Sequence, residues 1–169
     1  MIEYRVRREE DLEACGEVLT QVHAQDGYPV EGVADPVGWL SGVGMLAAFV
    51  ASDEDEVLGH VALMTPSAGE TATLRALLGH NPPDDAVMLC RLFVHPRHRN
   101  SGIAERLVET ARSVTKSQFL EVLEKDVAAI RLYERLGWTL VGTSSHGYGD
   151  DETMLSYWYK APARMSEWP

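Results

Sequence analysis

The chain has 169 residues, a length that suits one domain with its own hydrophobic core. Its formal net charge is -11, which repels a phosphate backbone, so we expect no nucleic-acid partner. It contains no run of about 18 apolar residues and no apolar signal stretch near the N-terminus. We therefore expect a cytoplasmic protein with no membrane span, whose two cysteines are reduced.

The first half of the chain alternates strand and helix patterns. Residues 2–6 predict a strand, and residues 9–23 predict a helix with one apolar face. A loop rich in Gly, Pro and Asp leads to a short segment around Trp39. The apolar runs 45–52 and 57–64 flank an acidic turn and predict a β-hairpin.

A long connection over residues 65–86 contains a short helical pattern at 73–79. After it, the strand and helix patterns alternate more regularly. The second half predicts these elements in order: a central strand at 87–94, a helix from 102 to about 115, a strand at 118–123, a helix from Asp126 to Gly137, and strands at 138–143 and 153–160.

These elements predict an α/β fold with a mixed α+β sheet of about seven strands and three or four helices. Neither a repeat nor a linker divides the chain. We expect a single domain over residues 1–160 and a C-terminal tail, residues 161–169, without clear structure.

The segment HPRHRNSGIAERLV, residues 95–108, favours an anion site at a helix start. Pro96 ends the strand ladder, and the helix begins near Gly102. The first turn of a helix leaves backbone N–H groups unpaired and carries partial positive charge, both of which an anion satisfies. Basic and small residues flank this start: Arg97, His98, Arg99, Gly102 and Ala104.

Two common phosphate motifs do not fit this segment. A P-loop needs Lys-Ser or Lys-Thr after its glycines, and a dinucleotide fingerprint needs a second glycine pair and a ribose-binding acid. RNSGIA, residues 99–104, instead resembles the Arg/Gln-x-x-Gly-x-Gly/Ala motif of the GNAT N-acetyltransferase superfamily. DVAAIRLYERLGW, residues 126–138, resembles the second motif of that family, and the resemblance extends over residues 87–142.

The resemblance implies a GNAT fold whose central strands splay to admit the pantetheine arm of coenzyme A. It also implies direct transfer of an acetyl group from acetyl-CoA to a primary amine, without a metal. Three strand residues would bind the pantetheine arm through their backbone, and six turn residues would hold the pyrophosphate: Leu92, Phe93 and Val94, then Arg99, Asn100, Ser101, Gly102, Ile103 and Ala104.

Two residues of the second motif are implied at the donor site. Tyr133 matches the family's tyrosine near the sulfur, where a phenol can protonate the departing thiolate. Asp126 stands where many members have Asn. Its carboxylate caps a helix equally well, but it replaces an amide that can donate to the cofactor.

No general base is implied by position, because Cys90 and Arg91 stand where the family often has a strand glutamate. For each other candidate a surface or packing role competes with catalysis, and proton loss through water is an alternative. These candidates are His23, Asp26, His60, Glu121, His146 and Asp150.

The acceptor is a small-molecule or peptide amine that the sequence does not identify. Tyr28 and Trp39 lie where the family builds the acceptor side of its cleft and could form an apolar wall, although a core role suits Trp39 equally well. The acidic loop 144–152, with Asp150, Asp151 and Glu152, favours a cationic acceptor. His95 and His98 lack a third ligand, so we predict no metal site.

Two further alternatives remain open. Because fold does not fix function, a catalytically silent acyl-CoA-binding or regulatory module is a second hypothesis. A homodimer is the open alternative to a monomer, and an exposed sheet edge or apolar patch would favour it.

Overall fold

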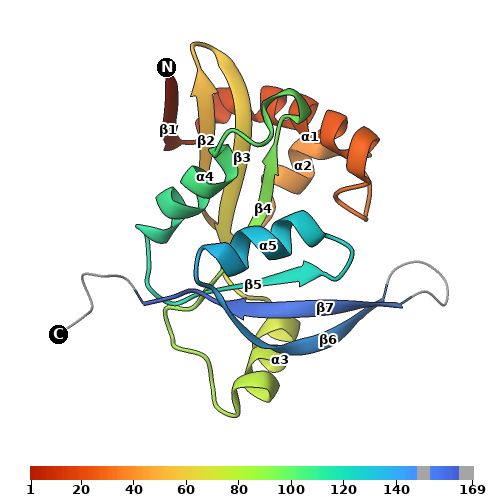
Figure 1. The fold of residues 1–169 in the computed structure, drawn as a ribbon, viewed down its shortest axis with the longest axis vertical. Helices are drawn as coiled ribbons and strands as arrows, with labels where there is room; N and C mark the ends of the chain where they lie inside the picture. Colours follow the sequence, from red (N-terminus) through yellow and green to blue (C-terminus); the bar gives the residue numbers. More distant parts are fainter. Residues whose placement is uncertain (148–152, 164–169) are drawn as a thin grey trace. The chain divides into compact units, whose positions relative to one another are not determined.

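A mixed seven-stranded sheet, in the order β1-β2-β3-β4-β5-β7-β6, organises the chain in this computed structural model (Figure 1). The structure describes residues 1–147 and 153–163, with no side chains for residues 146 and 147. The chain divides into two compact units. The first unit contains residues 1–64 and 89–113, and the second contains residues 65–88 and 114–169.

The strands of the first unit form antiparallel pairs. The predicted hairpin is confirmed, because β2 (Met45–Asp53) pairs with β3 (Glu56–Met64) across the acidic turn. The edge strand β1 (Ile2–Val6) pairs with β2. The predicted central strand is β4 (Val87–Val94), which enters this unit at residue 89.

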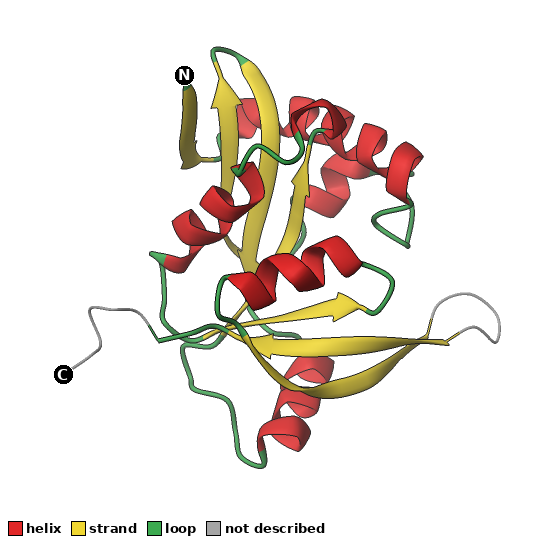
Figure 2. Ribbon diagram, in the orientation of Figure 1, coloured by secondary structure: helices red, strands yellow, loops and turns green. Residues whose placement is uncertain are grey.

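Helices cover both faces of this part of the sheet (Figure 2). The predicted first helix begins as a short 3-10 turn, Glu9–Asp11, and continues as α1 (Leu12–Asp26). Its apolar face packs with α2 (Pro36–Leu40) and the buried ring of Phe93. On the opposite face lies α4 (Ile103–Arg112). Gly59 of β3 packs closely against α4, because a Cβ there would lie 3.0 Å from Leu107 Cδ1.

The second unit combines three strands with two helices. The strand β7 (Thr153–Lys160) lies antiparallel to both β5 (Gln118–Leu123) and β6 (Thr139–Gly147). The start of β4 pairs with β5 in parallel, with Val87 opposite Gln118 and Met88 opposite Phe119. The helices are α3 (Ala68–Leu78) and α5 (Val127–Arg135).

The structure contains five α-helices among the described residues, one more than the upper prediction. The addition is α2, which is too short for a periodic pattern to reveal and begins with Asp35 accepting a hydrogen bond from Gly38 N. The helix expected at residues 73–79 begins earlier, because Ser67 and Glu70 form a capping box. The helix expected to reach about residue 115 ends at Arg112.

Candidate active site

A left-handed residue interrupts β4 in the middle of its apolar run. Arg91 has φ +53°, a conformation that costs a residue with a Cβ roughly 1–2 kcal/mol. The surrounding structure offsets this cost, because Nδ1 of His60 lies 2.9 Å from the Arg91 carbonyl oxygen. The only trace of the interruption in the sequence is a charged residue inside the apolar run VMLCRLFV.

Beyond Arg91, alternate residues of β4 direct their backbone to opposite sides. His95 N donates to Leu58 O of β3 at 2.7 Å, and the Phe93 carbonyl lies beside Gly59 of β3. Because successive residues of a strand alternate in direction, Leu92 and Val94 point their backbone groups away from β3. Phe93 instead points its carbonyl toward β3, and its side chain packs in the core. Pantetheine binding by the backbone of these three residues stays a prediction.

The turn after β4 has the geometry of an anion site. Asn100 and Gly102 have φ values of +60° and +82°, and Gly102 is the N-cap of α4. A Cβ at position 102 would meet no atom within 4 Å, so the chain needs glycine there for its φ and not for space. Residues 100–102 are exposed, and α4 begins directly after them. Left-handed residues next to a helix start turn successive N–H groups toward a common point.

Contacts within the turn hold it in this shape. His95 is buried and its Nδ1 accepts from Arg97 N at 3.1 Å, while the Ser101 hydroxyl donates to the His98 carbonyl. Arg99 forms an ion pair of 2.5 Å with Asp26, the last residue of α1. The arginine of the motif thus ties the turn to α1, and its guanidinium is engaged by Asp26.

The predicted aromatic pair does come together in the first unit. The rings of Tyr28 and Trp39 meet edge to face with centroids 6.0 Å apart. Arg91 also contacts Trp39: its Nε donates to the Trp39 carbonyl at 2.8 Å, and its guanidinium lies 4.3 Å from the ring centroid. Arg7 donates to the Leu40 carbonyl at 2.7 Å, so two arginines hold the C-terminal end of α2.

His60 cannot serve as an exchangeable base in this arrangement. Its side chain is fully buried, and burial, the largest cause, lowers the pKa of His60 to about 4. Arg7 approaches its Nε2 at 2.9 Å, and its Nδ1 faces the Arg91 carbonyl. Both ring nitrogens are engaged inside the core, which confirms a packing role.

None of the other candidate residues is assigned as the general base. Asp26 pairs with Arg99, and Glu121 is a half-buried residue of β5. His23 lies in the last turn of α1. The side chain of His146 and all of Asp150, Asp151 and Glu152 lie outside the described residues, so the predicted acidic wall is not placed.

The two predicted residues of the second motif belong to the second unit. Asp126 occupies the N-cap position of α5, but its side chain makes no capping hydrogen bond, so the prediction of a carboxylate cap is wrong. Its backbone carbonyl accepts from Ile130 N instead. Tyr133 is buried, and its ring lies 5.6 Å from that of Trp138.

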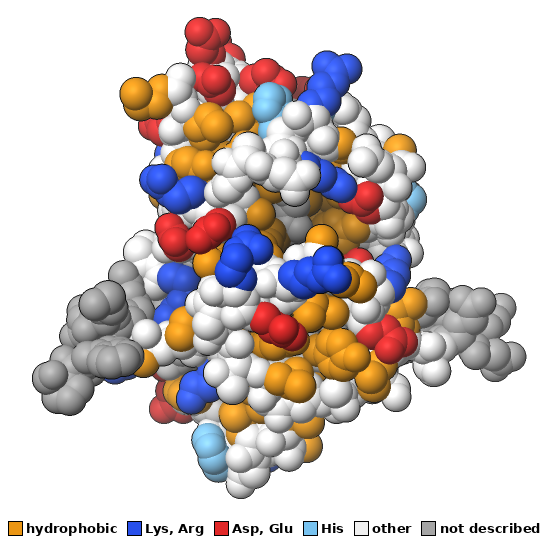
Figure 3. All heavy atoms as spheres, in the orientation of Figure 1, with side chains coloured by type: hydrophobic (Ala, Val, Ile, Leu, Met, Phe, Trp, Pro, Cys, Tyr) orange, Lys and Arg blue, Asp and Glu red, His pale blue; other side chains and the backbone are white. Residues whose placement is uncertain are grey.

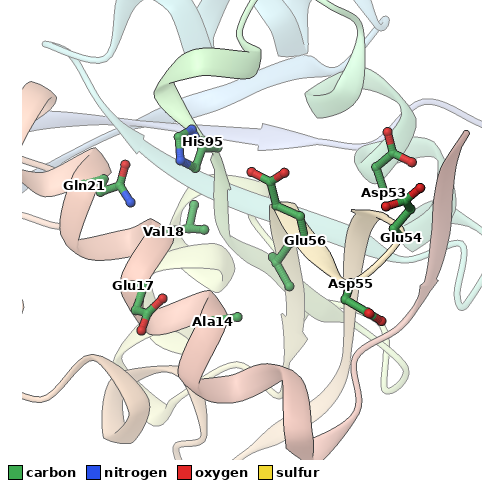
Figure 4. A pocket seen from close by; sticks show the side chains of 10 residues that line it. Ala14, Glu17, Val18, Gln21, Asp53, Glu54, Asp55, Glu56 and His95 are labelled. Atoms are coloured by element: carbon green, nitrogen blue, oxygen red, sulfur yellow. The ribbon is translucent and has the colours of Figure 1, made fainter.

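An acidic hollow of about 520 Å³ lies elsewhere in the first unit, between α1 and the β2–β3 turn (Figure 4). Glu17 of α1 and four consecutive acidic residues, 53–56, line it together with His95. Acidic side chains also dominate this turn on the surface (Figure 3). The negative charge makes the hollow unsuited to a pyrophosphate.

Neither a metal centre nor a membrane helix emerges from the described residues. They contain no group of three or more His, Cys, Asp or Glu side chains arranged to hold a metal ion. His95 and His98 pack edge to face at 5.5 Å, and Cys15 and Cys90 are not joined by a disulfide. Within residues 1–147 and 153–163, every helix is too short or too polar to cross a bilayer.

The strand, turn and helix around Gly102 carry the first of the two motifs that resemble the GNAT superfamily, and comparison with known proteins agrees. The acetyltransferase (GNAT) family matches residues 17–138, so this chain belongs to the GNAT family of acetyltransferases. No curated protein sequence matches the chain.

Solved structures share the fold at low identity. The ribosomal-protein-S18-alanine N-acetyltransferase from Escherichia coli is 18% identical with a TM-score of 0.70, over 98% of this chain and 96% of that one. NAA60 from Arabidopsis thaliana in complex with acetyl-CoA is 23% identical with a TM-score of 0.66, over 95% and 97% of the two chains. yncA from Salmonella typhimurium, with its cofactor acetyl-CoA, is 16% identical with a TM-score of 0.67, over 99% and 97%. These likenesses confirm the predicted GNAT fold.

Proposed function

We propose that this protein is an acetyl-CoA-dependent N-acetyltransferase that transfers acetyl directly to a primary amine. The observation that carries the proposal is the turn at the start of α4, where left-handed Asn100 and Gly102 precede an exposed helix N-terminus. That turn follows a kinked β4 in a chain of the GNAT acetyltransferase family. Solved structures of the same fold contain acetyl-CoA.

The residues present suit the donor. Backbone N–H groups of residues 99–104 would hold the pyrophosphate, because the helix N-terminus offers unpaired donors and positive potential. The backbone of Leu92 and Val94, directed away from β3, would bond the pantetheine arm as an added strand does. Phe93 supports this edge from the core, where its ring stacks on His60 at 5.0 Å.

The donor supplies an activated acetyl thioester when bound. The amine attacks only as its neutral form, so its proton must leave before or during attack. Among the described candidates, His60 is enclosed and Asp26 is paired with Arg99, which favours proton loss through water. The Tyr133 hydroxyl would donate a proton to the departing sulfur, since a thiolate is a poor leaving group until it is stabilised.

The acceptor would be a cationic amine bound beside Tyr28 and Trp39. Their edge-to-face contact forms an apolar wall, and Arg91 holds it in place. The chain carries a net charge of -11, which attracts ammonium groups by its long-range field. One protein with the same fold is named for an alanine of a ribosomal protein, so peptide amines belong in the test.

The deciding experiment is thiol release from acetyl-CoA with four classes of amine: an alkyl amine, a polyamine, a free amino acid and peptides with a free N-terminus. We expect amine-dependent release, highest with cationic acceptors. Preference for neutral or anionic amines would overturn the proposed acceptor class. Tight acetyl-CoA binding without turnover of any amine would instead identify a silent acyl-CoA-binding module, the alternative that the missing strand glutamate keeps open.

Tyr133→Phe tests the proposed proton donor. We expect kcat to fall by roughly 10²-fold or more, the usual contribution of a positioned acid, while acetyl-CoA affinity changes little. The ring keeps its packing against Trp138, so folding should survive. Steady-state kinetics and calorimetric binding measure the two effects, and unchanged kcat would remove Tyr133 from the chemistry.

A further inference from the structure

A chain of polar contacts through the buried His60 links three segments that lie far apart in the sequence. Arg7, which directly follows β1, approaches His60 Nε2 on β3 at 2.9 Å, and His60 Nδ1 reaches the carbonyl oxygen of Arg91 on β4 at 2.9 Å. His60 has no exposed surface and its ring stacks on Phe93, 14° from parallel. All four residues belong to the first unit.

The hydrogen-bond partners settle which ring nitrogen carries the proton. A guanidinium can only donate, so Nε2 of His60 must accept from Arg7. A carbonyl can only accept, so Nδ1 must carry the hydrogen that it donates to Arg91. The ring is therefore neutral and in a single tautomer, and it has no capacity left for a third partner in the plane of the ring.

The Arg91 carbonyl needs this donor because it belongs to a left-handed residue in the middle of β4. A left-handed residue disrupts the regular ladder between neighbouring strands, and the carbonyl of a half-buried residue needs a hydrogen-bond donor. The His60 side chain supplies the missing donor across 31 positions of sequence. The next residues, Leu92 to Val94, then follow in the alternation that turns two backbone edges away from β3.

We propose that His60 is a positioning residue for the acyl donor: its Nδ1–H holds the Arg91 carbonyl and so keeps the Leu92 and Val94 backbone aimed at the pantetheine arm. The proposal rests on the proposed function, because it assigns His60 a task in acetyl-CoA binding. His60 touches neither substrate and takes no part in proton transfer. Its effect reaches the donor only through β4.

Two substitutions separate the two ring nitrogens. In His60→Asn, the side-chain amide can place its NH₂ near the former Nδ1 and keep the bond to Arg91. In His60→Gln, the longer side chain reaches the former Nε2 position and keeps an acceptor for Arg7, but it loses the donor to Arg91. Calorimetric titration with acetyl-CoA measures the consequence for each protein, and circular dichroism melting reports folding.

We expect His60→Asn to bind acetyl-CoA within about threefold of the wild type and His60→Gln to bind at least tenfold more weakly, a difference of about 1.4 kcal/mol. Equal affinities of the two variants, or weaker binding by the Asn variant, would overturn the role of His60. A wild type that does not bind acetyl-CoA would overturn the proposed function as well, so the two failures are distinguishable.

A double variant guards against a merely structural effect. Glycine adopts positive φ without strain, but Arg91→Gly also removes the Trp39 contacts of the guanidinium, so the single variant Arg91→Gly is the reference. In that background His60→Gln should cost little further affinity for acetyl-CoA. A further loss of tenfold or more would show that His60 does not act through the conformation of residue 91. This double variant also carries the test if His60→Gln alone does not fold.

Leu74→Ala is the matched control for lost stability. Leu74 is fully buried in the core of the second unit, whereas the β4 kink belongs to the first, and it has no part in the polar chain. It should lower the melting temperature while leaving acetyl-CoA affinity unchanged. A similar loss of affinity in this control would attribute the His60→Gln result to general destabilisation and overturn the proposal.

Discussion

Backbone geometry at single residues shapes the donor side of this protein. Gly102 and Arg91 both have positive φ, but only Gly102 adopts it freely. At Arg91 the cost is offset by a side-chain donor and by the Trp39 contacts of its guanidinium. A strained residue held by specific partners marks a position where conformation matters more than local preference.

The need for glycine at position 102 can be tested against a matched glycine. Gly79 has φ +80° and ends α3, and a Cβ there would meet no atom within 4 Å, as at Gly102. Alanine at either site should cost roughly 1–2 kcal/mol of unfolding free energy. Only Gly102→Ala should also weaken acetyl-CoA binding, by about tenfold, because it displaces charge-assisted N–H bonds. Urea unfolding and calorimetry measure both, and equal binding by both variants would contradict the anion site.

His60 makes the stability of the protein depend on pH. Its pKa is lowered from 6.5 to about 4 by burial, so the unfolded chain takes up a proton before the folded one does. Stability is therefore lost as pH falls from about 6.5 to about 4, by about 2 kcal/mol at pH 5. The lowered pKa of His95 acts in the same direction, whereas the lowered pKa of Asp11 acts only at more acidic pH.

The control is His60→Asn, which does not titrate. Urea unfolding at pH 7.5 and pH 5 should show a smaller loss for this variant than for the wild type, by about 2 kcal/mol. Parallel pH profiles would mean that His60 is not buried in its neutral form.

At the level of elements, α4 packs closely against β3, and Gly59 of β3 lies at this contact. Ile103 and Leu107 both approach Gly59, and so does the Phe93 carbonyl. Three neighbours converge on this one glycine, which lets the helix, β3 and β4 meet closely. The requirement is steric, since Gly59 is not among the residues with positive φ.

Gly59→Ala should therefore destabilise the first unit. The new Cβ would lie 3.0 Å from Leu107 Cδ1 and 3.1 Å from the Phe93 backbone oxygen, which cannot move without β4. Overpacking of this kind costs roughly 1–3 kcal/mol. In the control Gly16→Ala, within α1, the nearest atom is a Pro36 carbon at 3.4 Å, so better helix propensity should leave stability equal or up to about 1 kcal/mol higher. Thermal melts that show equal losses would contradict the steric account.

At the scale of the whole molecule, the net negative charge opposes the binding of an anionic acyl donor. The acidic residues outnumber the basic ones, and several of them line the acidic hollow near the β2–β3 turn, so the long-range field repels an anion. The proposed binding of acetyl-CoA would then depend on short-range hydrogen-bond donors at the turn. The chain divides into two compact units, and the single domain over residues 1–160 stays a prediction.

Acetyl-CoA should stabilise the whole chain by mass action. A ligand that binds only the folded state adds about 2.7 kcal/mol at one hundred times its Kd. For a chain of this size, that corresponds to a rise in melting temperature of roughly 5–11 °C. ATP, which carries adenine and phosphates but no pantetheine, should give a smaller rise. Equal shifts for the two ligands would mean that the β4 edge contributes nothing to donor binding.

The sequence by itself determined what depends on neighbours a few positions apart. The β2–β3 hairpin, the apolar face of α1, the glycine that begins α4 and the two family motifs all follow from local pattern and turn chemistry. The same locality explains the misses: α2 is too short to show a period, and Asp126 holds a cap position without making the capping bond.

Only the tertiary structure decided which distant polar groups meet. His60 reaches Arg91 across 31 positions and Arg7 reaches His60 across 53, and each looked like an ordinary member of a strand or its flank. A sequence pattern records which side chains are apolar or charged, but the pairing of separated strands sets which of them share a buried space. That pairing makes His60 a neutral donor in the core and turns the Leu92 and Val94 backbone away from β3.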